Sequence, residues 1–230
     1  MRLSLSSAAA PEARLDQLFE AAARCGFGAV ELREGDGHGV ARDDGPGITA
    51  AAAEASVARI GISGYRVLQP AHDLALARLS YTLGTPILLD GPKDPAGRLD
   101  RAVRMRRAGA DVAVVLRGPS TSEAGTIIAA AGLSLAWDAD PSLGAPDREL
   151  ESLLRCAPHA LRHIRLLGGG PEVAMQEGSG VDRLMRRLAL AGYEGTLVLA
   201  PSTTRYRSEW QQWLGRRGRS TGCGSGRVAR

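Results

Sequence analysis

Short apolar segments alternate with longer stretches of mixed apolar and polar residues along the whole chain. Each apolar segment is four to six residues long, and several of them end in a charged residue. They are residues 3–6, 29–33, 62–67, 86–90, 112–117, 133–138, 163–167 and 197–200. Because strands that alternate with helices form parallel sheets, eight such units predict an α/β fold, a single closed (β/α)8 TIM barrel.

The stretches between these segments have apolar residues at helical spacing. In the first stretch, Leu15, Leu18 and Phe19 share one face. Pro11 is expected to open this helix and Gly26 to end it. The expected helices are 12–25, 49–59, 71–83, 99–108, 120–131, 147–157 and 181–191, followed by a last helix that contains Trp210, Trp213 and Leu214.

A long, acidic, glycine-rich loop is expected at residues 34–47, directly after the second strand. Long loops at this end of a barrel often cover an active site. A loosely ordered surface loop is an equally good interpretation of the same residues.

The length of 230 residues is near the lower limit for a (β/α)8 barrel, which is roughly 200 residues. The barrel is therefore expected to occupy residues 1–214, with no second domain. Residues 215–230 contain five arginines and many Gly and Ser residues but few groups to bury, so this tail is expected to be disordered. Without those arginines, 24 basic residues face 25 acidic ones, so the net charge of +4 does not indicate a nucleic-acid partner.

The three cysteines, Cys25, Cys156 and Cys223, are isolated from one another, and no CxxC spacing is present. This pattern does not support a zinc site and fits a reducing cytoplasm better than a disulfide framework. No apolar run reaches the length of a signal peptide or of a membrane span. We therefore expect a cytoplasmic protein without a membrane partner; the sequence leaves its oligomeric state open.

Four segments together resemble the xylose isomerase-like TIM-barrel superfamily, which includes sugar-phosphate isomerases and epimerases, hydroxypyruvate isomerase, inosose dehydratase and enzymes of the endonuclease IV type. The segments are LDQLFEAAARCGFGAVELRE, LSLAWDADPS, HALRHIRLL and LALAGYEGTLVLAPS. Their most specific parts are the Gly-Phe-x-x-Val-Glu of the second strand, the Trp-Asp of the sixth, and the Ala-Gly-Tyr-x-Gly before the eighth. The resemblance covers about residues 1–214.

Enzymes of this superfamily usually hold one divalent metal ion with Glu, Asp, His and Glu at the ends of the fifth to eighth strands. The resemblance maps these positions onto Arg117, Asp138, Arg165 and Ala200, so only the aspartate is retained. An arginine has no lone pair available at neutral pH and adds positive charge. We therefore expect no bound metal, no other cofactor and no metal-assisted isomerisation.

Side chains two residues apart on a strand share a face, which pairs Glu31 with Arg33 and His163 with Arg165. If the family alignment holds, six side chains converge on the barrel mouth, and Arg66 is a candidate to join them from the third strand. The six are Glu31, Arg33, Arg117, Asp138, His163 and Arg165. The candidate catalytic residues are Glu31, His163 and Asp138. The candidate substrate-binding residues are Arg33, Arg66, Arg117 and Arg165.

Two interpretations of these charges stay open. One is an internal ion-pair network in which Asp138 bridges Arg117 and Arg165. The other is a site where two or three arginines hold a phosphate or carboxylate.

Two functions follow from these interpretations. The first is a metal-independent isomerase, epimerase or lyase for a small anionic sugar or keto acid, with Glu31 or His163 as the base. The second is a ligand-binding or scaffold pseudoenzyme. An enzyme of the endonuclease IV type needs a multi-metal cluster, which four histidines in the whole chain do not support.

Overall fold

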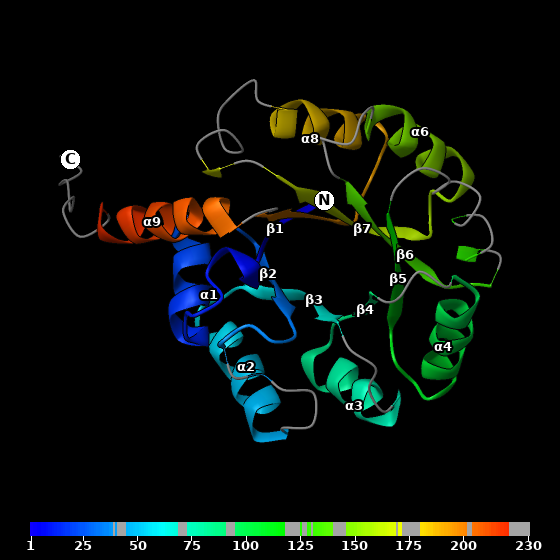
Figure 1. Cartoon of the computed structure of the whole chain (residues 1–230), viewed down its shortest axis with the longest axis horizontal. Coiled ribbons are helices and arrows are strands. Elements are labelled where there is room, and N and C mark those ends of the chain that lie inside the picture. Colours follow the sequence, from blue (N-terminus) through cyan, green and yellow to red (C-terminus); the bar gives the residue numbers. More distant parts are fainter. Residues whose placement is uncertain are drawn as a thin grey trace, which may run out of the picture.

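The computed structural model is a closed barrel of eight parallel strands in sequential order, β1 to β8 (Figure 1). It describes residues 1–38, 40, 45–68, 73–90, 95–117, 125, 128–129, 131–139, 146–168, 170–171, 180–201 and 204–220. The strands are β1 (Arg2–Ser6), β2 (Ala29–Arg33), β3 (Gly61–Val67), β4 (Ile87–Leu89), β5 (Val112–Arg117), β6 (Ser134–Ala139), β7 (Leu161–Leu167) and β8 (Thr196–Ala200). All eight lie on the predicted segments, and the predicted (β/α)8 barrel is confirmed.

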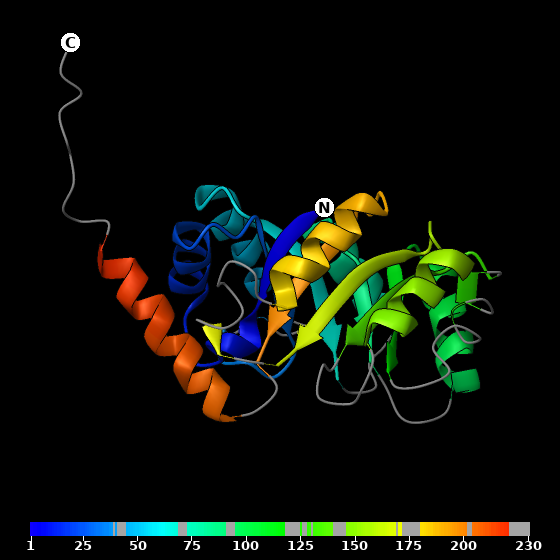
Figure 2. The ribbon, with the colours of Figure 1, turned by 90° about the horizontal axis from the view of Figure 1, so that it is seen from above.

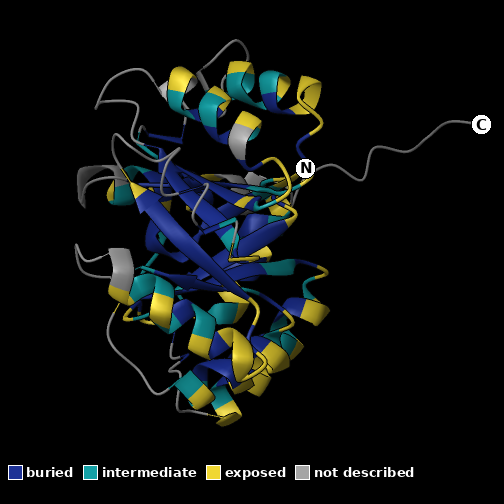
Figure 3. Cartoon of the chain, turned by 90° about the vertical axis from the view of Figure 1, so that its right-hand side faces the viewer, coloured by how far each residue is buried: buried dark blue, intermediate teal, exposed yellow. Residues whose placement is uncertain are grey.

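Helices pack around the outside of the barrel and expose their outer faces (Figures 1 and 3). They are α1 (Leu15–Arg24), α2 (Gly45–Val57), α3 (Asp73–Leu83), α4 (Pro95–Arg107), α6 (Pro146–Cys156), α8 (Gly180–Leu190) and α9 (Thr204–Ser220), and a short 3-10 helix, η1 (Ser7–Ala9), follows β1. The helix predicted at 120–131 lies largely outside the described residues; residues 125, 128 and 129 are helical.

Three predicted helix starts were wrong by three or four residues, and one of them is that of α4, which begins at Pro95 rather than at residue 99. Pro11 does not open the first helix: the Ser6 side chain caps η1 by accepting from the amide of Ala8, so the chain turns before α1 begins at Leu15. In contrast, α2 begins at Gly45 rather than at residue 49, because Pro46 in its first turn is compatible with helical backbone. The connection after β2 is therefore shorter than predicted.

The last helix is longer than predicted, because α9 continues to Ser220. Residues 215–220 of the segment expected to be disordered are therefore helical, and residues 221–230 lie outside the described residues. Trp210 and Trp213 anchor this helix: they are buried and meet edge to face, with ring centroids 5.5 Å apart. Arginine is a good helix former, so the helix propagates beyond its anchor.

The apolar core has two separate parts. The larger part lies between the strands and the helices, where every second strand residue points outward. The smaller part consists of Leu88, Ala113, Val115 and Ala136 from β4, β5 and β6. These residues fill one side of the barrel interior with apolar groups, whereas the facing strands β1, β2, β3 and β7 place polar side chains inside.

The strand register shifts by one residue at two places. Between β2 and β3, Val30 pairs with Ile62 and Glu31 with Gly64, so Ser63 is an extra residue. Between β6 and β7, Leu135 pairs with Leu161 and Ala136 with His163, so Arg162 is an extra residue. Each bulge changes which of the following residues point into the barrel.

Candidate functional site

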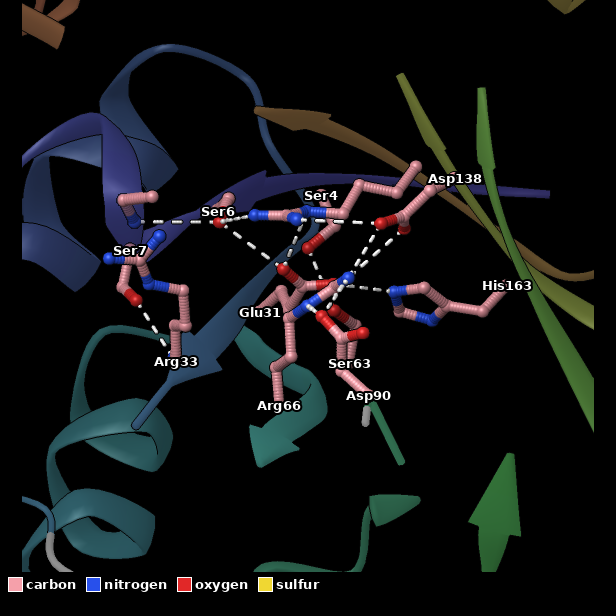
Figure 4. Close-up of polar contacts among 12 residues, drawn as sticks. Ser4, Ser6, Ser7, Glu31, Arg33, Ser63, Arg66, Asp90, Asp138 and His163 are labelled. Atoms are coloured by element: carbon pink, nitrogen blue, oxygen red, sulfur yellow. Dashed lines mark hydrogen bonds and ion pairs between the residues drawn. The ribbon is translucent and has the colours of Figure 1, made fainter. Parts of the chain in front are cut away.

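A layer of charged side chains crosses the barrel near the carboxyl ends of the strands (Figure 4). The register aligns Arg117 of β5 with Asp138 of β6 and Asp138 with Arg165 of β7, and all three side chains point inward. From the other side, β2 contributes Glu31 and β3 contributes Arg66. Functional residues of TIM barrels lie at this end, so the layer is the candidate site.

Arg66 is the centre of the layer. Its Nη1 donates to Oδ1 of Asp138 at 3.0 Å, and its Nη2 donates to Oδ2 of Asp138 at 2.5 Å. Its Nε and Nη2 lie 3.0 and 2.6 Å from Oδ2 of Asp90, which follows β4. The Arg66 side chain is 1% exposed, so its charge is held in the interior by two carboxylates.

Arg117 binds the same two carboxylates from the rim. Its Nε donates to Oδ2 of Asp138 at 2.9 Å, and its Nη2 donates to Oδ2 of Asp90 at 2.5 Å. The Arg117 side chain is 54% exposed, whereas that of Asp138 is 1% exposed. Arg117 is therefore the member of the layer that faces solvent.

Glu31 is fully buried and has partners on both oxygens. Oε1 accepts from Ser6 Oγ at 3.2 Å and lies 3.1 Å from Nε of Arg165. Oε2 lies 3.0 Å from Nε2 of His163. Arg165 also donates to Ser6 Oγ at 3.2 Å. Glu31 and its partners thus form a second group of contacts beside the group centred on Arg66.

The charges of the layer balance, with the three guanidiniums of Arg66, Arg117 and Arg165 facing three carboxylates. Burial alone raises the pKa of Glu31, but Arg165 and the hydrogen bond to His163 outweigh it and lower that pKa to about 2. Burial also raises the pKa of Asp138, and Arg66 outweighs it, so the net shift is downward. Both carboxylates are therefore ionised at neutral pH.

Arg33 belongs to a different group of contacts. Its Nη2 lies 3.1 Å from Oδ1 of Asp36, whose other oxygen accepts from Ser7 Oγ at 2.5 Å. Nearby, Nε2 of His38 contacts the carbonyl of Arg33 at 2.9 Å, and Nδ1 of His38 accepts from the amide of Val40 at 3.2 Å. These contacts fix the described part of the predicted loop 34–47, of which residues 39 and 41–44 lie outside the described residues.

The expected bridge between Arg117 and Arg165 differs from the observed one. Asp138 binds Arg66 and Arg117 directly, whereas Nη1 of Arg165 is 4.0 Å away and Arg165 pairs mainly with Glu31. The expectation missed Asp90 and Ser6. Both end a predicted apolar segment, as Arg117 and Asp138 do, so the same sequence signal was present for them.

A divalent ion does not fit the described side chains. Within the described ranges, no three or more His, Cys, Asp or Glu side chains come together as a metal-binding group. Arginines contact both oxygens of Asp138, Oδ2 of Asp90 and Oε1 of Glu31, whereas Oε2 of Glu31 contacts His163 and Ala200 offers no ligand. The guanidiniums of Arg66 and Arg117 place positive charge directly beside Asp138.

No protein-family model and no curated protein matches the sequence. Solved structures do match. A xylose isomerase domain containing protein from Salmonella typhimurium LT2 aligns at 16% identity over 94% of this chain and 95% of that one, with a TM-score of 0.64. The chain has the xylose isomerase-like TIM-barrel fold.

Two further solved structures that share the fold bear the names of different enzymes. D-psicose 3-epimerase from Clostridium cellulolyticum H10, solved with D-tagatose, aligns at 17% identity, covering 98% of this chain and 93% of its own, with a TM-score of 0.62. A family 2 AP endonuclease from Brucella melitensis aligns at 15% identity, covering 94% and 98%, with a TM-score of 0.59. At such identities the likeness concerns the fold, and a fold does not determine a function.

Within the described part of the chain, the helices are too short or too polar to cross a membrane.

Proposed function

We propose that this barrel binds a small anionic sugar or keto acid at its mouth without a divalent metal, as a non-catalytic member of its fold. The observation that carries the proposal is the closed layer of ion pairs, in which arginines neutralise the buried carboxylates Glu31 and Asp138. The near-neutral barrel and the isolated cysteines support a cytoplasmic protein without a nucleic-acid partner.

Arg117 is the residue that would contact the anion. It projects from the layer with half of its side chain exposed, while Asp90 and Asp138 hold one edge of its guanidinium. Arginine binds carboxylates and phosphates through paired hydrogen bonds, which suits an acidic sugar derivative or a keto acid. Arg33, whose side chain is 23% exposed, is the second candidate at the rim.

The state of the candidate bases supports binding rather than catalysis. A general base has to come within hydrogen-bond reach of the substrate proton and have a pKa near the working pH. Glu31 is fully buried, both of its oxygens have partners, and its pKa of about 2 makes it a weak base. His163 is 2% exposed and faces Glu31.

A metal-independent isomerase or epimerase is the second candidate function. The 3.0 Å contact between His163 and Glu31 favours it, because a carboxylate that orients a histidine is a common arrangement for proton transfer. Such an enzyme would have to open the ion-pair layer so that a substrate reaches His163.

Titration calorimetry with ribose 5-phosphate and with pyruvate tests the proposal. We expect saturable binding that Arg117→Met abolishes while the protein stays folded, because Arg66 still pairs with both Asp90 and Asp138. Arg186→Met is the matched control, since Arg186 is an exposed arginine paired to Asp182 on α8. Absence of binding to the native protein, or equal binding by Arg117→Met, would reject the mouth as an anion site.

Proton NMR in D2O separates the two candidate functions. A metal-independent isomerase exchanges the proton next to the carbonyl of a substrate with solvent, whereas a binding protein leaves it in place. Exchange that disappears in Glu31→Gln would favour the enzyme.

A further inference from the structure

A second cavity lies at the opposite end of the barrel from the ion-pair layer. It has a volume of about 410 Å³ and is bounded by the last turn of α4 and the amino ends of β5, β6 and β7. In Figure 2 the amino ends of the strands lie along the upper edge, where the chain begins. The volume is within the range of small-molecule sites, roughly 300–1,000 Å³.

The wall of this amino-end cavity is partly apolar and partly cationic. Val112 and Leu133 are each 3% exposed and form apolar wall. Arg106, Arg162 and His159 line it with positive or protonatable groups, and Asp111 is the acidic residue among the lining residues. A pocket with an apolar wall and a few convergent polar groups is the usual form of a ligand site.

Arg106 reaches the cavity from α4. Its Nη1 donates to the carbonyl of Gly132 in the turn before β6. Among the described residues, no carboxylate lies within ion-pair distance of Arg106, in contrast to Arg101 and Arg104 of the same helix, which both contact Asp73. The charge of Arg106 is thus not neutralised by a described acid.

Arg162 reaches the cavity from the opposite side. It is the extra residue of the bulge in β7, and bulges of this kind redirect side chains. Its Nη1 is 3.7 Å from Oδ2 of Asp111, a distance longer than a hydrogen bond, and both side chains are about half-exposed. Arg162 can therefore exchange this loose contact for an incoming anion.

We propose that the amino-end cavity binds a small organic anion. Arg106 and Arg162 hold its carboxylate or phosphate group from two sides, and its apolar body lies against Val112 and Leu133. Ser134 and His159 add hydrogen bonds. The cavity shares no described residue with the ion-pair layer, so this site is independent of the function proposed for the mouth.

Phenyl phosphate is a suitable probe, because it combines a phosphate with an apolar ring. We expect saturable binding to the full chain in a calorimetric titration, with amide NMR shifts at Val112, Leu133 and Ser134. Arg106→Met and Arg162→Met should each weaken this binding about tenfold or more, because a hydrogen bond to a charged group is lost.

Two controls make the result specific. Arg107→Met removes an exposed arginine of α4 that does not line the cavity, and it should leave binding unchanged. Arg117→Met should also leave it unchanged, so that failure of the mouth site and failure of this site are distinguished. Absence of saturable binding, equal losses in Arg106→Met and Arg107→Met, or NMR shifts confined to the mouth would overturn the proposal.

Discussion

Arg66 holds both oxygens of Asp138 across the interior of the barrel, with Nη1 and Nη2 at 3.0 and 2.5 Å from Oδ1 and Oδ2. Arg66 starts on β3 and Asp138 on β6, so this paired contact links strands that are not neighbours in the sheet. It also brings Asp90 into the same group of charges. The stability of the barrel therefore depends on Arg66 more than on any exposed arginine.

Replacing Arg66 with methionine should destabilise the protein by about 3–5 kcal/mol, because it leaves Asp138 buried without its main partner. Urea denaturation measures this change in the free energy of unfolding. Arg66→Lys keeps the charge but not the paired geometry, so it should fall between Arg66→Met and the native protein. Arg186→Met, at an exposed ion pair, should cost less than about 1 kcal/mol. Equal effects of Arg66→Met and Arg186→Met would contradict the central role of Arg66.

The protein purified without chelator should contain far less than one equivalent of manganese, zinc or magnesium. The reason is chemical: guanidiniums bind both oxygens of Asp138, Oδ2 of Asp90 and Oε1 of Glu31, and place positive charge beside all three carboxylates. Elemental analysis of the native protein and of Asp138→Ala tests this expectation. A stoichiometric ion that Asp138→Ala no longer retains would show that the charged layer does hold a metal.

The barrel should lose stability in acid as the carboxylates of the layer become protonated. The folded protein lowers the pKa of Glu31 from 4.5 to about 2 and also lowers that of Asp138. A lowered carboxyl pKa stabilises the folded state above the unfolded pKa, and this contribution is lost as the pH falls from about 4.5 towards 2. Melting temperatures measured across this range should fall less steeply for Glu31→Gln than for the native protein. Parallel pH profiles of the two proteins would count against ionised Glu31 as a source of stability.

His38 should make the segment after β2 sensitive to mild acid. Burial lowers the pKa of His38, a residue that is 7% exposed and whose Nδ1 accepts from the amide of Val40. The unfolded chain then binds a proton at His38 more readily than the folded chain. The contribution of neutral His38 to the free energy of unfolding is therefore fully present above pH 6.5 and is lost as the pH drops below it. Hydrogen exchange at the Val40 amide should accelerate below pH 6.5, relative to the intrinsic rate, in the native protein. His38→Asn should not show this added pH dependence, and the same dependence in both proteins would assign it to another group.

The sequence could predict where the strands lie, because each is a short, mainly apolar run between helical stretches and several of these runs end in a charged residue. It could also predict that Arg117, Asp138 and Arg165 share a face, since they lie near the carboxyl ends of strands that pair in order. It could not predict that Arg66 rather than Arg165 is the main partner of Asp138. An arginine side chain spans much of the barrel interior, so the choice among carboxylates depends on distances that residue order does not contain.

The bulges at Ser63 and Arg162 were also hidden in the sequence. The position of Ser63 is accompanied by a tight fit at Gly64, where an added Cβ would lie 2.9 Å from Cδ1 of Leu88. Small residues mark close approaches, but they do not show which strand carries the extra residue.

Because of these two bulges, the side chains that enter the barrel interior are set by how many residues β3 and β7 contain as well as by the types of those residues. Ile62 faces the helices, and strict alternation from it would turn Arg66 outward; the extra residue Ser63 turns Arg66 inward instead. Arg162 has the same effect on His163 and Arg165. Deleting one residue from either strand would move a charged side chain into the apolar layer between strands and helices while leaving every other amino acid unchanged. The charged layer therefore depends on the number of residues in β3 and β7. Substitutions leave the inward-facing positions in place, whereas single-residue deletions shift them.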